Sequence, residues 1–415
     1  MSTGKKKGLL GRILSDSVWT IAGLVLMNVL AQFVVYPVWN RQMGNEAYGN
    51  ALSLLSGMNI LAISMGTACN YARMTVSAKG ETRNRPYSRA MLAASWIAIP
   101  YMIIFCALTG NTGAKEEALL ILLTILTMWR FYADVEYRLS LDYKGYFLYY
   151  LVISIGYGIG ILLYLQTGLW PLALLPGEAA GLIWVAARGR VLRSEDEETD
   201  PEENQKIFSL IVTLFLSNLI GNLLYNGDRV ILQLMMDGTA VSIYYQASLL
   251  GKTMTLITTP LNSVLIGYLA RYKGGVNRRM MGYMGLGVIA ACLIGTGVCT
   301  AASHILIRIL YPQNYDLVKG YFMVANLAQI MYFAANVVLT VLLRFFRAKY
   351  QVTVNLIGAV LFIAFGIIGI RLGGLTGFCW SFVIVCLLRL GYAIWVGIRD
   401  AGKNFNGGKM EEEQS

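Results

Sequence analysis

Charge and histidine are both scarce in this sequence. Only 14% of its 415 residues are charged and only His304 is a histidine, whereas 56% are hydrophobic and the mean hydropathy is +0.57. A soluble domain is about 25% charged, and so few polar residues could not cover the surface of a soluble fold. The composition therefore excludes a disordered chain and an ordinary soluble enzyme, and it predicts a polytopic membrane protein.

Several motifs that carry chemistry are absent as well. The cysteines show no CxxC spacing, so we expect buried core residues rather than zinc ligands or a redox pair. A lone histidine excludes an HExxH metalloprotease. The sequence contains no GxxxxGK[ST] loop of an ATPase and no TVGYG channel filter. We expect no enzyme activity, no metal and no cofactor other than a coupling ion, H⁺ or Na⁺.

Apolar runs long enough to cross a bilayer recur along the whole chain. A spanning helix needs about 20 mostly apolar residues. The sequence predicts twelve transmembrane helices, approximately at 17–39, 49–70, 88–109, 117–133, 146–165, 169–187, 207–227, 241–269, 281–302, 320–343, 353–371 and 374–397.

The basic residues fit this count. With the N-terminus in the cytoplasm, about 26 Lys and Arg fall inside and about six outside, which is the bias of the positive-inside rule. The net charge of +11 thus has a topological origin, and we expect no nucleic-acid partner. The protein is predicted to lie in the inner or plasma membrane with both termini cytoplasmic.

The longest polar stretch divides the predicted helices six and six. We expect an N-terminal six-helix lobe at 1–187, a charged cytoplasmic linker at 188–206, a C-terminal lobe at 207–399 and a cytoplasmic tail at 400–415. Residues 40–51 and 228–247 share a pattern: charged residues at the end of one helix, a short turn that contains glycine, and a tyrosine at the start of the next helix. This weak repeat favours two lobes related by a pseudo-twofold axis along the membrane normal, around a central cavity.

Polar residues repeat at helical spacing inside four of the runs. Each set falls on one helix face and would either line a cavity or join neighbouring helices. The candidate substrate-binding members are Asn28 and Gln32; Asn218, Asn222 and Asn226; Thr255, Thr259 and Asn262; and Asn326 and Gln329.

A few ionisable residues fall within or beside the apolar runs. Lys252 and Glu178 lie deep in theirs, where a charge costs several kcal/mol unless it meets water or a partner. Arg389 lies close enough to a helix end for snorkelling to explain it. Asp134 and Glu136, near Arg130 and Arg138, are interpreted as a surface ion cluster rather than as an acid–base pair.

Prolines interrupt three runs. Pro37, Pro100 and Pro260 each remove a backbone hydrogen bond, which bends a helix. Pro37 and Pro260 serve either as flex points of cavity-lining helices or as fixed kinks.

Some of these residues carry a family resemblance. The segments Gly227-Asp228-Arg229-Val230-Ile231-Leu232 with Gly238, Ile243-Tyr244 and Ala247, and Tyr36-Pro37-Val38 with Arg41, Gly44 and Tyr48-Gly49, resemble bacterial polysaccharide repeat-unit flippases of the Wzx type. Ile63-Ser64-Met65-Gly66, Ile309-Leu310-Tyr311 and Tyr315 also fit. One departure is that family members often carry the helix-eight basic residue earlier than Lys252.

The resemblance implies an all-α fold of two six-helix lobes and a lipid-linked oligosaccharide as substrate. Lys252, with Arg41 and Arg229, would then bind the diphosphate, and the polar stripes the sugar. Glu178 or Asp228 would couple transport to an ion gradient. Partners would be the bilayer and the polysaccharide polymerase and glycosyltransferases of the same pathway. The alternatives are a multidrug cation exporter of the same superfamily, the multidrug/oligosaccharidyl-lipid/polysaccharide exporters, and a non-transporting membrane scaffold or integral membrane enzyme.

Overall fold

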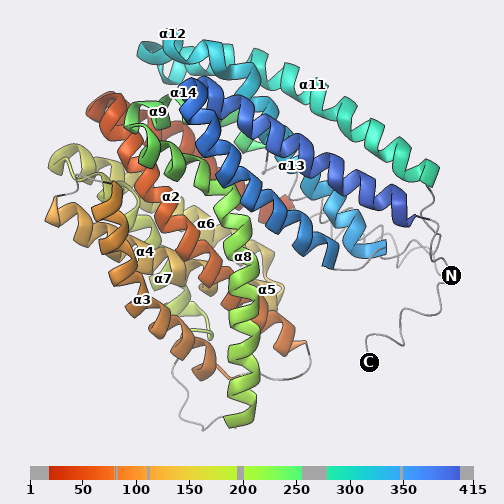
Figure 1. The fold of residues 1–415 in the computed structure, drawn as a ribbon. Helices are drawn as coiled ribbons and strands as arrows, with labels where there is room; N and C mark the ends of the chain where they lie inside the picture. The colour runs from red at the N-terminus through yellow and green to blue at the C-terminus, as the bar shows by residue number, and fades with distance from the viewer. Residues whose placement is uncertain are drawn as a thin grey trace, which may run out of the picture. The chain divides into compact units, whose positions relative to one another are not determined.

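The computed structural model describes residues 18–78, 80, 83–109, 113–193, 201–254, 278–345 and 349–401. Every regular element in these ranges is a helix, as Figure 1 shows. The all-α fold class is therefore confirmed for this part of the chain.

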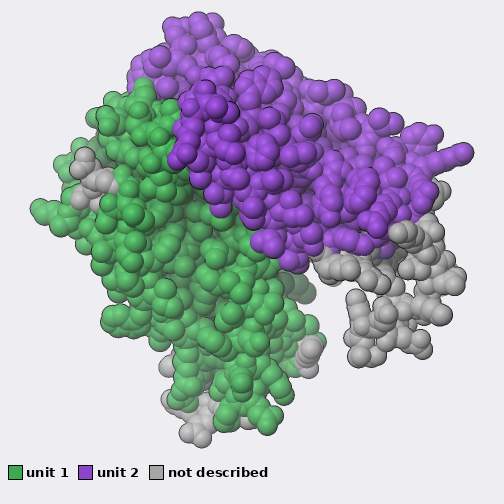
Figure 2. Space-filling view, viewed as in Figure 1, with its two compact units in different colours: residues 1–242 green, residues 243–415 purple. Residues whose placement is uncertain are grey.

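The chain divides into two compact units, residues 1–242 and 243–415, which Figure 2 colours separately. Helix α8 belongs to the first unit because it packs chiefly against α2. Helix α9 (Gly238–Thr253) begins in unit 1 and continues in unit 2. Unit 1 otherwise contains η1 (Ala31–Val35), α2 (Tyr36–Ser77), α3 (Arg85–Thr109), α4 (Ala114–Ala133), α5 (Val135–Ser140), α6 (Tyr143–Thr167), η2 (Trp170–Ala173), α7 (Leu175–Arg188) and α8 (Pro201–Met235). Unit 2 contains α11 (Arg278–Leu310), η3 (Pro312–Asn314), α12 (Tyr315–Val318), η4 (Lys319–Tyr321), α13 (Phe322–Phe345) and α14 (Lys349–Asp400).

Within the described ranges, eight helices are long and apolar enough to cross a membrane. Their outward faces carry large apolar side chains such as Leu372 and Trp96, which are 83% and 73% exposed. Apolar surface on this scale needs hydrocarbon rather than water around it. The chain is a multi-pass membrane protein.

Two of these helices are too long for one crossing. The first, Val18–Ser77, has 60 residues, about 90 Å at 1.5 Å per residue, against a hydrocarbon core of about 30 Å. It breaks at Gly44, whose φ of +79° suits glycine, and Asn40 Nδ2 donates to Asn45 Oδ1 across the break at 2.8 Å. The 52-residue α14 breaks in the same way at Gly373 and Gly374.

Pro37 and Pro100 lie within helical segments without ending them. Pro37 follows directly on the π-helical turn η1, which widens the helix where the proline ring would meet the preceding turn. Pro100 lies inside α3, whereas Pro260 lies outside the described residues.

The cysteine prediction is confirmed, because all six cysteines are free and buried. They are Cys69, Cys106, Cys292, Cys299, Cys379 and Cys386.

The tightest approach between helices in unit 1 joins the two segments of the sequence repeat. A Cβ added to Gly49 of α2 would lie 1.6 Å from the carbonyl oxygen of Gly238 at the start of α9. Ser242 Oγ donates to Asn45 Oδ1 at 3.4 Å in the same region. Only glycine lets these two backbones meet.

Gly49→Ala is therefore expected to destabilise the protein by about 1–3 kcal/mol through overpacking. Gly158→Ala on α6 is the matched control, because an added Cβ there meets nothing within 4 Å. Thermal unfolding in detergent compares the two variants. Equal melting temperatures for both would contradict the close packing of α2 on α9.

Candidate functional site: buried ion pairs and polar seams

Glu178 forms a buried ion pair inside unit 1. It lies in the first turn of α7, where the helix dipole favours a carboxylate. Its Oε2 accepts from Arg130 Nε of α4, and its Oε1 accepts from the Tyr157 hydroxyl of α6 at 2.6 Å. Glu178, Arg130 and Tyr157 are each 3–4% exposed. The charge that the sequence predicted to be buried therefore has both a cation and a hydroxyl to satisfy it.

Neighbouring groups tie this pair to the rest of the unit. The Tyr149 hydroxyl donates to the Arg130 carbonyl at 3.2 Å, and the Arg130 guanidinium lies 4.2 Å from the centre of the Phe131 ring. An event that protonates Glu178 or displaces Arg130 would thus act on α4, α6 and α7 together.

Asp134 lies in a second buried cluster, which corrects the sequence interpretation. It is 2% exposed and accepts from Asn70 Nδ2, from Arg138 at 3.2 Å, and from the Tyr146 and Tyr150 hydroxyls at 3.2 and 3.4 Å. The surface interpretation of Asp134 and Arg130 was wrong. The two tyrosines and the asparagine supply donors that make burial tolerable, and they come from helices that the sequence does not pair.

Glu136 has a different role from Asp134. Its Oε2 accepts from the backbone N–H groups of Arg190 and Val191, at 2.7 and 2.9 Å. The two carboxylates therefore serve different elements, as their two-residue spacing on a helix predicts.

The polar stripe on α8 faces α2 in this structure. Asn222 Nδ2 donates to Ser64 Oγ at 3.0 Å, and Arg229 Nη1 donates to Ser56 Oγ at 3.2 Å. Each serine in turn donates to its own helix, to the carbonyls of Ile60 and Leu52. Asn222 and Arg229 thus join helices, which is the helix-joining interpretation of that stripe.

The remaining members of the unit 1 stripes differ in burial. Asn226 is 2% exposed, and the side-chain nitrogens of Asn226 and Asn218 are buried without a hydrogen-bond partner. Asp228 is 1% exposed and accepts from the Arg229 backbone N–H at 2.9 Å. The side-chain nitrogens of Asn218 and Asn226 can therefore still donate hydrogen bonds from α8.

Toward the start of the chain, the candidate residues are less buried. Asn28 is half-buried and donates to the Leu24 carbonyl of its own helix at 2.8 Å, and Gln32 is also half-buried. Arg41 is exposed whereas Arg229 is 7% exposed, so these two arginines lie in different environments.

Polar residues also join the helices of unit 2. Asn326 Oδ1 accepts from the Gly251 N–H of α9 at 2.7 Å, and Asn326 Nδ2 donates to Ser303 Oγ of α11 at 3.1 Å. Gln329 Nε2 donates to the Tyr244 hydroxyl at 3.1 Å. Lys252 follows Gly251 directly in α9 and is 3% exposed. The other predicted members of that stripe, Thr255, Thr259 and Asn262, lie outside the described residues.

Arg389 of α14 is buried rather than snorkelling to the interface. It is 5% exposed and donates to the Tyr332 carbonyl, Asn336 Oδ1 and Asn355 Oδ1 at 2.6–3.1 Å. Its guanidinium also lies 4.7 Å from the Tyr332 ring centre. Neutral acceptors and a π-face solvate this cation, and among the described residues no carboxylate pairs with it.

Arg130 and Tyr157 were not predicted as site residues. A signal for Arg130 existed, because it lies inside a predicted span, as Glu178 does, and opposite charges in a bilayer tend to pair. Tyr157 gave no signal among 25 tyrosines. Within the described residues, no three His, Cys, Asp or Glu side chains gather in a way that could hold a metal ion.

Comparisons with known proteins find the fold but not a sequence family. No family model matches the chain, and no curated protein does. A solved structure described as the inward-facing conformation of a multidrug resistance MATE family transporter of the MOP superfamily matches with a TM-score of 0.65. That match has 12% identity and covers 93% of this chain and 99% of the other.

The lipid II flippase MurJ in an inward closed conformation matches almost as well, with a TM-score of 0.64 and 12% identity over 92% of this chain and 87% of its own. The fold is that of MOP-superfamily transporters. A further MOP transporter, from Pyrococcus furiosus, matches with a TM-score of 0.57 and 14% identity over 94% of this chain and 96% of its own. These matches establish the fold of the chain. At such identities it does not choose between drugs and lipid-linked sugars.

Proposed function

We propose that this protein is a flippase that moves polyprenyl-diphosphate-linked oligosaccharides from the inner to the outer leaflet by ion-coupled alternating access. It would serve the export of capsule, O-antigen or exopolysaccharide, in the manner of Wzx-type proteins. Its partners would be the lipid-linked substrate, the bilayer, and the polymerase and glycosyltransferases of the pathway.

The balance of buried charge is the observation that carries this proposal. Among the described residues, five basic side chains are buried against three acidic ones. Glu178 and Asp134 are both bound by arginines and tyrosines, which leaves the excess positive. A diphosphate would meet that excess, whereas a cationic drug would need free carboxylates. The basic residues are Arg73, Arg130, Arg229, Lys252 and Arg389, and the acidic ones Asp134, Glu178 and Asp228.

Twelve crossings follow if the long helices are divided where they break. The breaks at Gly44 and at Gly373–Gly374 turn two of the eight candidate spans into four. The pair η2–α7 and the helix α9 would supply the other two, which are too short to count as spans within the described residues. We propose two six-helix lobes with a pseudo-twofold axis, at 1–187 and 207–399, joined by the linker at 188–206.

The proposed orientation of the protein in the membrane follows from the positions of its basic residues. Cytoplasmic termini put Arg85, Arg190 and Arg278 on the inner side, as the positive-inside rule requires. The tail at 400–415 would then also lie in the cytoplasm.

The substrate would meet both polar stripes and cations. Lys252, with Arg41 and Arg229 at the outer mouth, would bind the diphosphate. Hydroxyls of the sugar would replace the helix-joining hydrogen bonds that Asn222, Asn326 and Gln329 make in this state. Asn28, Gln32, Asn218, Asn226, Thr255, Thr259 and Asn262 would complete the set.

Ion coupling would act through Glu178 or Asp228. Protonation of Glu178 would remove its attraction for Arg130 and free a cation inside unit 1. A sodium ion would compete with Arg130 for the same oxygens.

The contact of Asn222 on α8 with Ser64 on α2 is called the α2–α8 seam. A disulfide across this seam tests the alternating-access step. In a cysteine-free background, Ser64→Cys with Asn222→Cys is expected to cross-link α2 to α8 and to reduce transport at least tenfold, because the seam must open for substrate. Dithiothreitol should restore transport. Ser64→Cys alone is the control. Full transport by the cross-linked protein would contradict an opening of this seam.

Deletion of the gene tests the proposed function against its rivals. We expect loss of surface polysaccharide and accumulation of lipid-linked repeat units on the inner leaflet, with unchanged resistance to cationic drugs. Drug sensitivity with normal polysaccharide would favour the multidrug exporter. Neither change would favour a scaffold or an integral membrane enzyme.

A further inference from the structure

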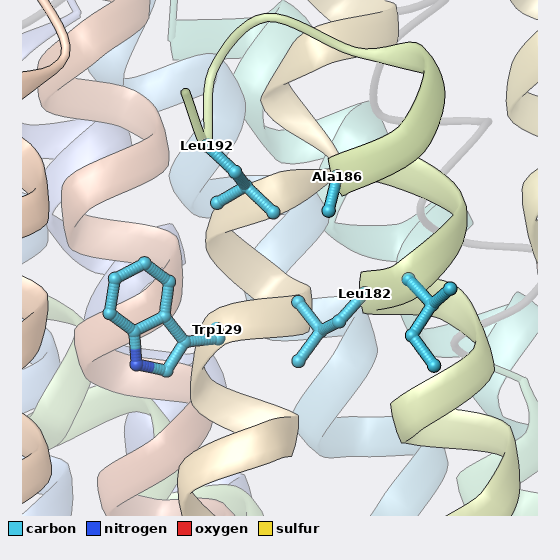
Figure 3. Close-up of a pocket in the computed structure, with 5 residues that line it drawn as sticks. Trp129, Leu182, Ala186 and Leu192 are labelled. Atoms are coloured by element: carbon cyan, nitrogen blue, oxygen red, sulfur yellow. The ribbon is translucent and has the colours of Figure 1, made fainter. Parts of the chain in front are cut away.

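An apolar pocket with an arginine-rich end lies on the outside of unit 1. It has a volume of about 330 Å³ and is lined by Trp129 of α4, by Leu182, Ile183 and Ala186 of α7, and by Leu192 in the turn that follows α7. Figure 3 shows Leu192 and Ala186 toward the end where the chain leaves α7. All five lining side chains are apolar, which suits a hydrocarbon chain.

The chain is held firmly at that end of the pocket. Asn84 Nδ2 donates to the carbonyls of Arg190 and Arg193 at 2.8 and 3.0 Å. Glu136 accepts from the backbone N–H groups on the other side of the turn. Backbone hydrogen bonds therefore fix the turn, and the arginine side chains are not needed to hold it.

Those arginines are concentrated and face outward. Arg188, Arg190 and Arg193 are exposed, and Arg188 lies 3.8 Å from the Trp184 ring centre. Arg85 follows Asn84 directly, and the exposed Arg89 lies one turn further along α3. Among the described residues none of these five forms an ion pair. Glu136 is occupied by the backbone of the turn, and the acidic residues that follow Arg193 in the sequence, Glu195 to Glu198, lie outside the described residues.

Trp129, which lines the pocket, lies near a second tryptophan on α3. Trp129 Nε1 donates to Ser95 Oγ at 3.0 Å, and Trp96 beside it is 73% exposed. Tryptophans of this kind gather where hydrocarbon meets head groups. The apolar pocket therefore adjoins exposed arginines, which is the combination that an acyl chain and its phosphate require.

We propose that this pocket binds an anionic phospholipid of the cytoplasmic leaflet. One acyl chain occupies the space between Trp129 and Ala186, and Arg190 and Arg193 bind the phosphate. The charge of the turn selects the anionic lipid, because each basic residue near a membrane surface attracts an anionic head group. The site is separate from the transport path and does not depend on the proposed substrate.

Lipid titration of the purified full-length protein in detergent tests the site. Binding of phosphatidylglycerol and of phosphatidylcholine is measured by native mass spectrometry and by the shift in melting temperature. We expect phosphatidylglycerol to bind about 30-fold more tightly, which corresponds to two arginine contacts.

Two variants and one control distinguish binding at this site from non-specific lipid binding. Arg190→Gln/Arg193→Gln should bring the two lipids to within about threefold of each other. Ala186→Trp should fill the pocket and weaken the binding of both lipids. Arg278→Gln/Arg279→Gln removes two exposed arginines at the start of α11 and should leave the 30-fold preference intact. Equal binding of the two lipids by the unaltered protein, or a preference that survives the Arg190/Arg193 change, would overturn the proposal.

Discussion

Replacing Arg130 with methionine is expected to destabilise the protein by about 3–5 kcal/mol, because Glu178 would keep its charge in a buried place with only the Tyr157 hydroxyl to satisfy it. The expected readout is a large fall in melting temperature, or loss of monodisperse protein in detergent. The double variant Arg130→Met/Glu178→Leu should recover most of the stability, since it removes both charges at once. Under the proposed coupling it should still fail to transport.

Arg138→Met is the matched control for this experiment. It also removes an arginine from a buried carboxylate, but Asp134 would keep its bonds from Asn70, Tyr146 and Tyr150. The Arg138 side chain is also 36% exposed, so water screens its pair. A larger loss of stability in Arg138→Met than in Arg130→Met would contradict the ranking of the two clusters.

Lys252→Met is expected to reduce polysaccharide export by about 10- to 150-fold. A hydrogen bond to a charged group contributes about 1.5–3 kcal/mol, and methionine keeps the volume of the lysine stem while removing the ammonium. Lys252→Arg should retain part of the activity, because it keeps the charge at a shifted position. Export is measured as surface polysaccharide at matched levels of membrane-inserted protein.

Lys206→Met is the control for the lysine experiment. Lys206 is 80% exposed and forms only a loose pair with Glu202 at 3.9 Å, so its loss should leave export unchanged. Normal export by Lys252→Met would remove Lys252 from the mechanism. It would leave the fold and the Arg130–Glu178 pair untouched.

The sequence predicts the helices well because burial in lipid imposes a simple rule on every span. An apolar run must satisfy its own backbone, and only a helix does so within one segment. The rule gives the location of α3, α4 and α6 within a few residues. It does not show that the long helix through Pro37 breaks at Gly44, because a glycine break depends on backbone angles rather than on hydropathy.

The partners of the buried charges could not be predicted in this way. Periodicity shows that Asn222 and Asn326 lie on a polar helix face, but the neighbour of that face depends on how helices pack. The sequence predicts an exposed Asp134 because a carboxylate near two arginines at a helix end usually lies at the surface. Its burial requires Asn70 from α2 and two tyrosines from α6, and these contacts span many residues of chain.

The fold leaves the substrate open for a physical reason. One arrangement of helices matches both a multidrug transporter and a lipid II flippase, so the backbone alone does not set what passes through. The sign and availability of the buried charges can set it. In this chain arginines and tyrosines occupy Glu178 and Asp134, and buried basic side chains outnumber acidic ones among the described residues, which favours an anionic substrate.

Translocation in reconstituted vesicles tests that central claim most directly. Purified protein is placed in vesicles that carry a fluorescent polyprenyl-diphosphate oligosaccharide, and the label that reaches the opposite leaflet is quenched with a membrane-impermeant reductant. We expect translocation well above that of protein-free vesicles, and loss of translocation in Lys252→Met. Background-level movement of this lipid, in the same vesicles that accumulate an organic cation, would contradict it.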